Sequence, residues 1–323
     1  MSLSFRPAKR ENVNLLIGVA GPSGSGKTYS AMRLASGISN GKSFAVIDTE
    51  RGRASHYADA FKFDVLELAP PYSPARYLEA IEAADAADYP VIVVDSMSHS
   101  WAGEGGCMDM QEEEFKRLGS RDTVKLLSWN RPKTEHKRML YGLLKVKAHV
   151  ILCFRAEPKV EVSKDKDEKT VIVAKKTMTS IDGWIPICEK TLPYELTCSA
   201  LLLPDNPGVP KWIKLQEQHK VMFPVGHPLD ETAGKRIASW AHGVSELGAG
   251  YVAAHAPTND VAAPGSKQMV SVADYTILIK EADQESLPSL WTDIQSACRL
   301  AGDAQSRIDL KLVIDERKKE LGI

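Results

Sequence analysis

Residues 21–28 restrict what this chain can fold into more than any other stretch. They read Gly-Pro-Ser-Gly-Ser-Gly-Lys-Thr and fit the pattern G-x-x-x-x-G-K-[ST]. The apolar residues 14–20 before them are typical of a buried strand, and residues 29–38 after them have helical spacing. A strand, a glycine-rich turn and a helix in this order predict the phosphate-binding loop of an α/β nucleotide-binding core.

The residue types in this loop have physical reasons. Glycines let the backbone wrap closely around a phosphate with its N–H groups pointing inward. The helix N-terminus adds partial positive charge, Lys27 reaches the β- and γ-phosphates, and the Thr28 hydroxyl is a ligand for Mg²⁺. The sequence therefore predicts a site for ATP and Mg²⁺, with the nucleotide bound by Gly21, Pro22, Ser23, Gly24, Ser25, Gly26, Lys27 and Thr28.

Composition limits the partners and the compartment. The 323 residues are enough for one large core and a smaller appendage, and the net charge of −1 leaves any DNA contact to local basic patches. The five cysteines form no C-x-x-C pair and indicate reduced core residues in a cytosolic protein. No apolar stretch reaches the length of a membrane span, and the N-terminus lacks a signal-peptide pattern. We therefore expect a cytoplasmic protein without a membrane partner.

Strand-like and helix-like segments alternate after the loop. This alternation predicts a mostly parallel, twisted sheet with helices on both faces. In the helix over 132–147, the spacing puts Leu140, Leu143 and Leu144 on one face. The expected strands are 43–47, 63–68, 91–94 and 149–154, and the other expected helices are 75–87 and 108–118, with a loop over 101–106 between them.

The pattern becomes antiparallel after Arg155. Residues 160–162 and 170–173 flank a charged tip over 164–169, and a second hairpin joins 196–203 to 211–215. Residues 243–268 are rich in Ala, Gly and Pro, and residues 269–323 have helical periodicity. The predicted organisation is an ATPase core over 1–242, a flexible linker over 243–268 and a small helical module over 269–323.

Two acidic residues follow neighbouring strands. Asp95 suits a carboxylate that holds Mg²⁺ through water, and Glu50 is well placed to polarise a water in line with the γ-phosphate. Hexameric and packaging motor ATPases usually carry Glu where this chain has Ser96, so hydrolysis here requires Glu50 instead. An Asp that caps a loop and a Glu without a catalytic role are the alternatives.

These three segments together resemble the core of RecA-type recombinases. The similarity rests on residues 21–28, on Val-Ile-Asp-Thr-Glu over 46–50 and on Val-Ile-Val-Val-Asp-Ser over 91–96. Size and loop sequence are most similar to phage-encoded RecA-like ATPases of the AAA-domain type, some of which act in single-strand annealing. The resemblance covers residues 13–215 and implies catalytic roles for Lys27, Glu50 and Arg155 and metal binding by Thr28 and Asp95. Arg155 falls near the family's γ-phosphate sensor, which is commonly Gln in recombinases.

The resemblance also implies partners. RecA-like cores bind ATP between subunits of a homo-oligomer, where a neighbour's basic residue completes the site. Candidates are Lys159, Lys175 and Lys176, with a solvated charged face as the alternative. Single-stranded DNA is expected at residues 98–106 and 159–180, which include Trp101, Lys164, Lys166 and Lys169. The helical module is expected to bind a single-strand-binding protein or a recombinase, and a phage-encoded chain would work in the bacterial host cytoplasm.

Two other functions stay open. A small-molecule P-loop kinase would use arginines near the phosphate loop, and Arg51 and Arg53 could serve it, although kinases of this size usually end in helices rather than in an antiparallel extension. A nucleotide-dependent adaptor would bind ATP and show no DNA-stimulated hydrolysis.

Overall fold

The computed structural model describes residues 13–164, 170–174, 181, 183–243, 275, 279, 287, 290–291, 294–295 and 304–321. The chain divides into two compact units, Met1–Gly250 and Tyr251–Ile323. The first unit contains the phosphate loop and is built around a sheet. In the second unit, α11 (Ala304–Leu321) packs with buried Ile279, Leu287 and Ile294 through its own Leu310 and Ile314. The predicted linker lies outside the described residues, apart from Gly243.

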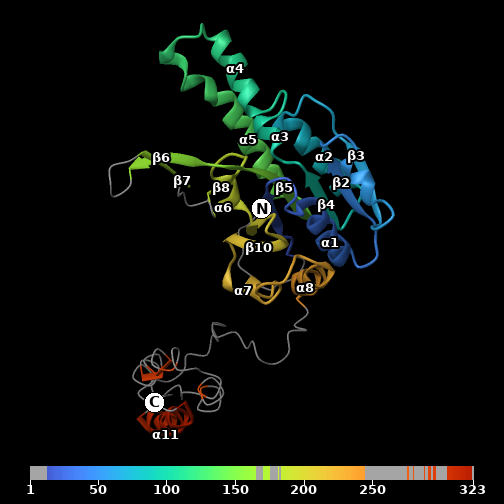
Figure 1. The fold of residues 1–323 in the computed structure, drawn as a ribbon. Helices are drawn as coiled ribbons and strands as arrows, with labels where there is room; N and C mark the ends of the chain where they lie inside the picture. Colours follow the sequence, from blue (N-terminus) through green and yellow to red (C-terminus); the bar gives the residue numbers. More distant parts are fainter. Residues whose placement is uncertain are drawn as a thin grey trace, which may run out of the picture. The chain divides into compact units, whose positions relative to one another are not determined.

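The sheet of the first unit has eight strands in the order β10-β9-β1-β5-β4-β2-β3, with β8 paired to β5 off this path. The pairs from β9 to β3 are parallel, while β10 and β8 pair antiparallel, which confirms the predicted fold class (Figure 1). Its strands are β1 (Leu16–Gly21), β2 (Phe44–Asp48), β3 (Phe63–Glu67), β4 (Val91–Asp95), β5 (His149–Pro158), β8 (Trp184–Pro186), β9 (Cys198–Leu203) and β10 (Asn206–Lys214).

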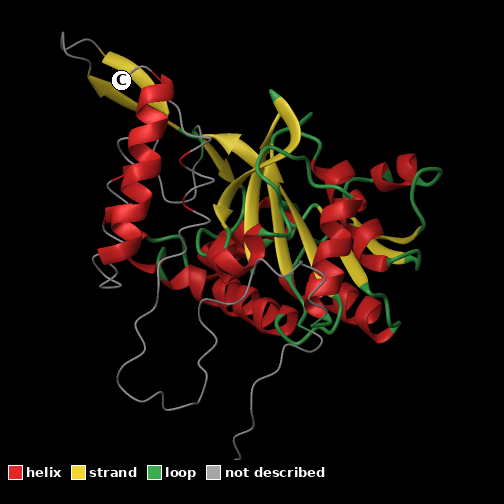
Figure 2. Cartoon of the chain, turned by 90° about the horizontal axis from the view of Figure 1, so that it is seen from below, coloured by secondary structure: helices red, strands yellow, loops and turns green. Residues whose placement is uncertain are grey.

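Helices cover both faces of this sheet. The central strands are apolar without interruption, as expected where both faces are buried. In β4, Ile92 and Val94 pack toward α2 and α5, whereas Val91 and Val93 pack toward α1 and α8. Figure 2 shows the strands of this unit with helices around them. The helices are α1 (Lys27–Ser39), α2 (Pro74–Ala86), α3 (His99–Ala102), α4 (Cys107–Arg117), α5 (Asn130–Leu143), α6 (Leu192–Glu195), α7 (Glu217–Lys220) and α8 (Glu231–Ala241), with 3₁₀ helices η1 (Arg53–Tyr57), η2 (Asp122–Val124) and η3 (Leu127–Trp129).

Most expected elements are present, and two local expectations are wrong. Trp101 lies in α3 rather than in a loop, and its indole stacks on Trp129 with ring centroids 5.6 Å apart. Leu144 is 57% exposed because the buried face of α5 is formed by Pro132, His136, Met139 and Leu143, and Leu144 lies one helical step beyond that face. The antiparallel extension is confirmed: β6 (Val160–Lys164) and β7 (Thr170–Ala174) form a separate two-stranded sheet.

Helices α1 and α8 touch at glycines. A Cβ added to Gly37 would lie 2.2 Å from the Glu231 carbonyl oxygen, and one added to Gly234 would lie 2.4 Å from the Leu34 carbonyl oxygen. Beside this contact, Arg33 Nη2 lies 2.7 Å from Glu231 Oε2. The close approach fixes α8 against the helix that begins at the phosphate loop (Figure 1).

No helix within the described part of the chain combines the length and the apolar character needed to span a membrane.

The buried side chain of His149 makes the stability of the first unit depend on pH. Its Nδ1 accepts a hydrogen bond from the Leu15 N–H (3.2 Å). Burial, with a smaller effect of His242, lowers the pKa of His149 from 6.5 to about 4. Between these values the unfolded chain binds a proton that the folded chain does not, so stability falls as the pH falls. We expect this residue alone to lower the free energy of unfolding by about 3 kcal/mol between about pH 7 and 4.

Urea unfolding of the wild type and of His149→Asn across this pH range checks the prediction. Asparagine offers an amide oxygen close to the position of Nδ1 but does not titrate. Its stability curve should therefore be flatter than that of the wild type by about the stated amount. Two parallel curves would show that His149 does not carry the effect.

Candidate active site

The phosphate loop joins β1 to α1 and is supported from inside. Gly24 and Gly26 have φ values of +79° and +81°, which side chains other than glycine adopt only with strain. Ser25 Oγ and Lys27 Nζ both donate to the Pro22 carbonyl oxygen, at 2.8 and 2.9 Å. Burial lowers the pKa of Lys27, against the opposing charges of Asp95 and Glu50. An anionic phosphate is the kind of ligand that would favour the charged form of this lysine.

A second segment buttresses the loop from the β9–β10 hairpin. The Gly208 N–H donates to the Ser25 carbonyl oxygen (3.1 Å), and the Leu229 N–H donates to the Gly208 carbonyl oxygen (2.9 Å). The hairpin that the sequence places after Leu196 therefore supports the phosphate loop at Ser25.

The parallel register gathers the predicted residues at one edge of the sheet. Strand β5 lies between β1 and β4, and it aligns Arg155 with Gly21 and Cys153 with Asp95. On the other side of β4, Asp48 aligns with Asp95, which places Glu50 two residues beyond the same edge. All the predicted catalytic and metal residues line a single cavity of about 370 Å³, formed by Gly21, Pro22, Ser23, Lys27, Thr28, Glu50, Arg53, Asp95, Arg155, Ala156 and Ile187.

Thr28 and Asp95 provide oxygen atoms where a cation would lie. Thr28 Oγ1 donates to Asp95 Oδ2 at 2.5 Å, and the carboxylate is buried at the end of β4. Burial raises the pKa of Asp95, and the charge of Glu50 adds to this, although the hydrogen bond from Thr28 opposes it. A hydroxyl and a carboxylate whose charge is poorly solvated fit a hard divalent cation such as Mg²⁺.

The carboxylate of Glu50 is hydrogen-bonded to the guanidinium group of Arg155. Arg155 donates from Nε to Oε1 (2.9 Å) and from Nη2 to Oε2 (2.6 Å), which forms a bidentate pair. Burial raises the pKa of Glu50, but the hydrogen bonds and charge of Arg155, with His99 and Arg53, outweigh it and lower the pKa. Glu50 is therefore ionised at neutral pH, and Arg155 uses both of these donors on Glu50 in this state.

His99 and Thr49 link the two strand ends in a way that the sequence did not reveal. Thr49 Oγ1 accepts from the Ser96 N–H (2.9 Å) and lies 2.8 Å from His99 Nδ1, while His99 Nε2 lies 3.9 Å from Glu50 Oε1. Burial, aided by the positive charge of Arg155, lowers the pKa of His99. A neutral His99 therefore orients this edge without competing with Arg155 for Glu50.

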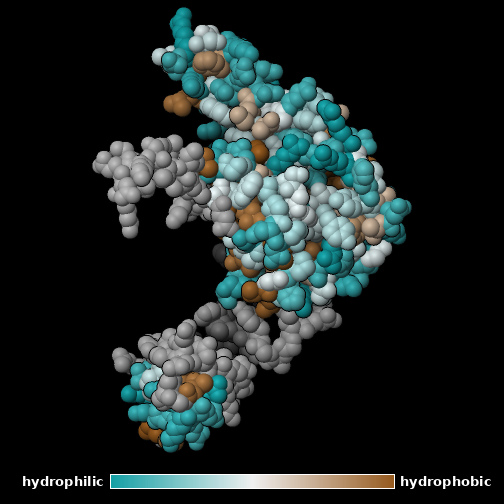
Figure 3. Space-filling model, viewed as in Figure 1, coloured by the Kyte–Doolittle hydropathy of each residue, from teal (hydrophilic) through white to brown (hydrophobic). Residues whose placement is uncertain are grey.

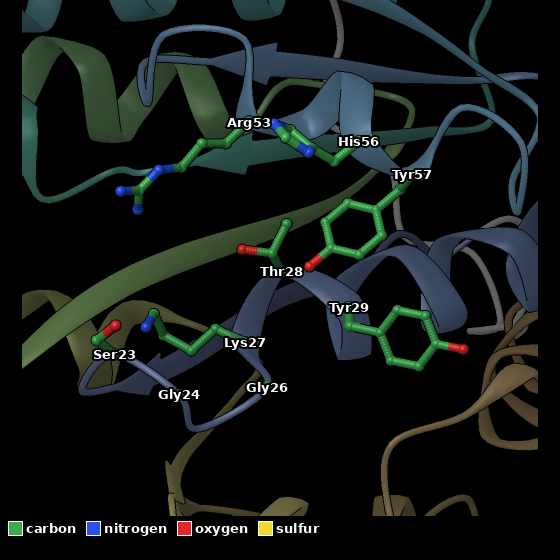
Figure 4. Close-up of a pocket in the computed structure, with 9 residues that line it drawn as sticks. All are labelled: Ser23, Gly24, Gly26, Lys27, Thr28, Tyr29, Arg53, His56 and Tyr57. Atoms are coloured by element: carbon green, nitrogen blue, oxygen red, sulfur yellow. The ribbon is translucent and has the colours of Figure 1, made fainter.

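The 3₁₀ helix η1 closes the nucleotide side of the site. Asp48 accepts hydrogen bonds from the N–H groups of Glu50 (2.5 Å) and Ala54 (3.0 Å), so its carboxylate holds the start of this helix. Between η1 and the phosphate loop lies a cavity of about 550 Å³ that Tyr29, His56 and Tyr57 line together with the loop (Figure 4). No periodic pattern marks η1, and its aromatic residues were therefore missed by sequence reasoning.

A third cavity, of about 620 Å³, lies on the far side of Glu50. It is lined by Arg51, Arg53 and Arg155, by His99 and Tyr72, and by the loop around Glu104. The rings of Tyr72 and His99 stack with centroids 5.1 Å apart. Three arginines outnumber the two carboxylates of this lining, Glu50 and Glu104, so the space has a net positive lining.

The predicted basic residues of the extension are only partly described. Lys159 Nζ lies 2.7 Å from Glu157 Oε1 and pairs within its own chain. Lys164 is in β6, and Lys166, Lys169, Lys175 and Lys176 lie outside the described residues.

Comparison with known proteins agrees with this geometry. No curated protein matches the chain. Residues 14–188, more than half of the chain, match a family described as AAA domain. The matched region runs from β1 past β8 and includes the phosphate loop, Glu50, Asp95 and Arg155. The chain therefore belongs to the AAA domain family of nucleotide-binding P-loop ATPases.

Proposed function

We propose that the chain hydrolyses ATP with Mg²⁺ and is stimulated by single-stranded DNA, as a RecA-like protein of phage recombination or annealing. The observation that carries the ATPase is the convergence of Lys27, Thr28, Glu50, Asp95 and Arg155 on one cavity of about 370 Å³. Lys27 and the loop N–H groups bind the β- and γ-phosphates, and Glu50 accepts the proton of the attacking water. Thr28 and Asp95 would hold Mg²⁺, which when bound neutralises charge on the phosphate oxygens.

The nucleoside would lie in the neighbouring cavity of about 550 Å³. Tyr29 is 47% exposed, and its ring lies 5.9 Å from the Tyr57 ring and 5.6 Å from the Phe61 ring, centroid to centroid. Aromatic faces beside a phosphate-binding loop suit a planar base. Tyr29 and Tyr57, both unnoticed in the sequence, are therefore the residues that we assign to the adenine.

The DNA part of the proposal is supported by continuity between β5 and the β6–β7 sheet. Strand β5 carries Arg155 and ends at Pro158, and β6 begins at Val160. Residues 165–169, which follow β6 in the sequence, include Lys166 and Lys169 beside three acidic residues, and we assign these lysines to contacts with phosphates. Nucleic acid bound there could shift β5, the strand that carries Arg155, and so change the contact between Arg155 and Glu50.

Steady-state ATP hydrolysis with and without a single-stranded oligonucleotide tests this function. We expect the oligonucleotide to raise kcat several-fold in the wild type and the effect to weaken with added salt. Replacing Lys164, Lys166 and Lys169 together by Glu should remove the stimulation, and replacing them by Arg should retain it. Hydrolysis that no single strand accelerates would leave a nucleotide-dependent adaptor as the better description.

Assembly is part of the same proposal. Figure 3 shows apolar surface near the outer end of α4, and the connection from α4 to α5 carries Leu126 and Leu127, which are 86% and 51% exposed. Apolar side chains exposed side by side are common at protein–protein contacts. We assign this end of the first unit to contacts in a homo-oligomer, and the second unit to binding a single-strand-binding protein or a recombinase.

A small-molecule kinase is the second candidate. The observation that favours it is the cavity of about 620 Å³ lined by Arg51, Arg53 and Arg155, because a phosphoryl acceptor with an acidic group would fit there. In such an enzyme, ADP would form without release of inorganic phosphate when the acceptor is present. Measuring both products in the same reaction separates a kinase from an ATPase.

A further inference from the structure

Arg53 is the side chain that reaches every part of the site. It lines the nucleoside cavity, the phosphate cavity and the arginine-lined cavity beyond Glu50. In Figure 4 its side chain extends from η1 across the space above Thr28, toward the side on which Ser23 and Lys27 lie. The side chain is 74% exposed, so its end can move while its backbone stays in place.

The other two arginines are less suited to reach a phosphate. Arg155 makes two short hydrogen bonds to Glu50, at 2.9 and 2.6 Å. Arg51 lines only the cavity beyond Glu50 among the three cavities of the site. Arg53 Nη1 lies 3.7 Å from Glu50 Oε2, which is close enough for attraction but too long for a hydrogen bond.

The base of Arg53 is fixed by the chain itself. The next residue, Ala54, is buried, and its N–H donates to Asp48 Oδ2 at 3.0 Å. Asp48 also accepts from the Glu50 N–H, so one carboxylate sets the separation between Glu50 and Arg53. A long charged side chain on a fixed base beside the reacting centre can bring positive charge to the place where negative charge develops in the transition state.

We propose that Arg53 is an arginine finger supplied within the same chain, which contacts the terminal phosphate oxygens of ATP during hydrolysis. This inference rests on the proposed ATPase function. Water oxygen forms a bond to the γ-phosphorus as the bond to the β–γ bridging oxygen breaks. The electron pair stays on ADP, Glu50 takes a proton from the water, and Arg53 keeps its own protons and stabilises the spreading negative charge. The neighbour's basic residue expected from RecA-like sites is then not needed for turnover.

Kinetics and nucleotide binding of Arg53→Ala, Arg53→Lys and the control Arg121→Ala, which removes an exposed arginine outside the three cavities of the site, test the finger. We expect Arg53→Ala to lower kcat by about 100-fold or more, with little change in KM, and Arg53→Lys to recover part of the loss. Affinity for ADP with aluminium fluoride, a mimic of the transferring phosphoryl group, should fall in Arg53→Ala while affinity for ADP alone stays the same. Arg121→Ala should behave as the wild type. Unchanged kcat and unchanged aluminium fluoride affinity in Arg53→Ala would overturn the proposal.

A mixing experiment decides whether the finger acts within one chain. Arg53→Ala has an intact phosphate loop, and Lys27→Ala has an intact Arg53. A finger that acts across subunits would restore turnover in a mixture of the two, whereas a finger within one chain leaves only the sum of the two separate rates. Restored turnover therefore overturns the inference. A wild type that hydrolyses no ATP contradicts the proposed function itself, and is a different result from an active wild type that does not need Arg53.

Discussion

Glu50→Gln will bind ATP and fail to turn it over. Glutamine fills the same space but cannot accept a proton, so we expect the rate of hydrolysis to fall by a factor of about 100 to 10,000. The carboxylate is 13% exposed and already ionised, because Arg155 lowers its pKa. The substitution therefore removes a charged base and its bidentate partner contact, while Lys27 and the loop still bind the phosphates.

Single-turnover hydrolysis and binding of a fluorescent ATP analogue measure the two effects separately. The matched control is Glu67→Gln, because Glu67 ends β3 in register with Asp48 but lies outside the three cavities of the site. That variant should hydrolyse ATP at the wild-type rate. If Glu50→Gln did so too, another group would have to accept the proton, and the assignment of Glu50 would be wrong.

Gly37→Ala is expected to destabilise the first unit. It places a methyl group 2.2 Å from the backbone oxygen of Glu231, and this clash can be relieved only if α1 or α8 moves. We expect it to lower the free energy of unfolding by about 3 kcal/mol, since overpacking against backbone outweighs the gain of about 1 kcal/mol in helix propensity.

Gly142→Ala is the control for this effect. Gly142 is also inside a helix, and the three atoms nearest to its added methyl group all belong to the Leu78 side chain, with Cδ1 at 2.2 Å. Because that side chain can rotate away, the control should change stability by less than about 1 kcal/mol. Urea unfolding of both variants gives the comparison. Equal losses would mean that the α1–α8 contact is more compliant than its geometry indicates.

The central architecture was predictable because its signals are local. The phosphate loop, the apolar strands and the residues that follow them are each visible in a short window. The carboxyl ends of parallel strands lie at one edge of a sheet, so Glu50 and Asp95 were expected to meet around the phosphate loop, and the resemblance to RecA-type recombinases added Arg155. In the structure all three line one cavity with Lys27 and Thr28.

The features that the sequence did not predict depend on contacts between segments that are distant in the sequence. The position of β5 between β1 and β4 is a matter of topology, and it brings Arg155 to Glu50 across 105 residues of sequence. The pairing of these two side chains could not be read from either strand. Leu144 was expected on the buried face of α5, but the face that packs inward contains His136, Met139 and Leu143, and periodicity alone does not decide which of the neighbouring residues face inward. The short helix η1 has no periodic signal, and the hydrogen bond from Ala54 to Asp48 places it.

The carboxylate of Asp48 fixes the length of the segment that follows β2. It is bonded to backbone on both sides of the turn at Arg51 and Gly52, so it fixes how many residues fit between β2 and η1. An insertion or deletion there would change the separation between Glu50 and Tyr57, and so between the residues that we propose for hydrolysis and for base binding. We therefore expect the number of residues in this turn to matter for activity as much as the side chains in it.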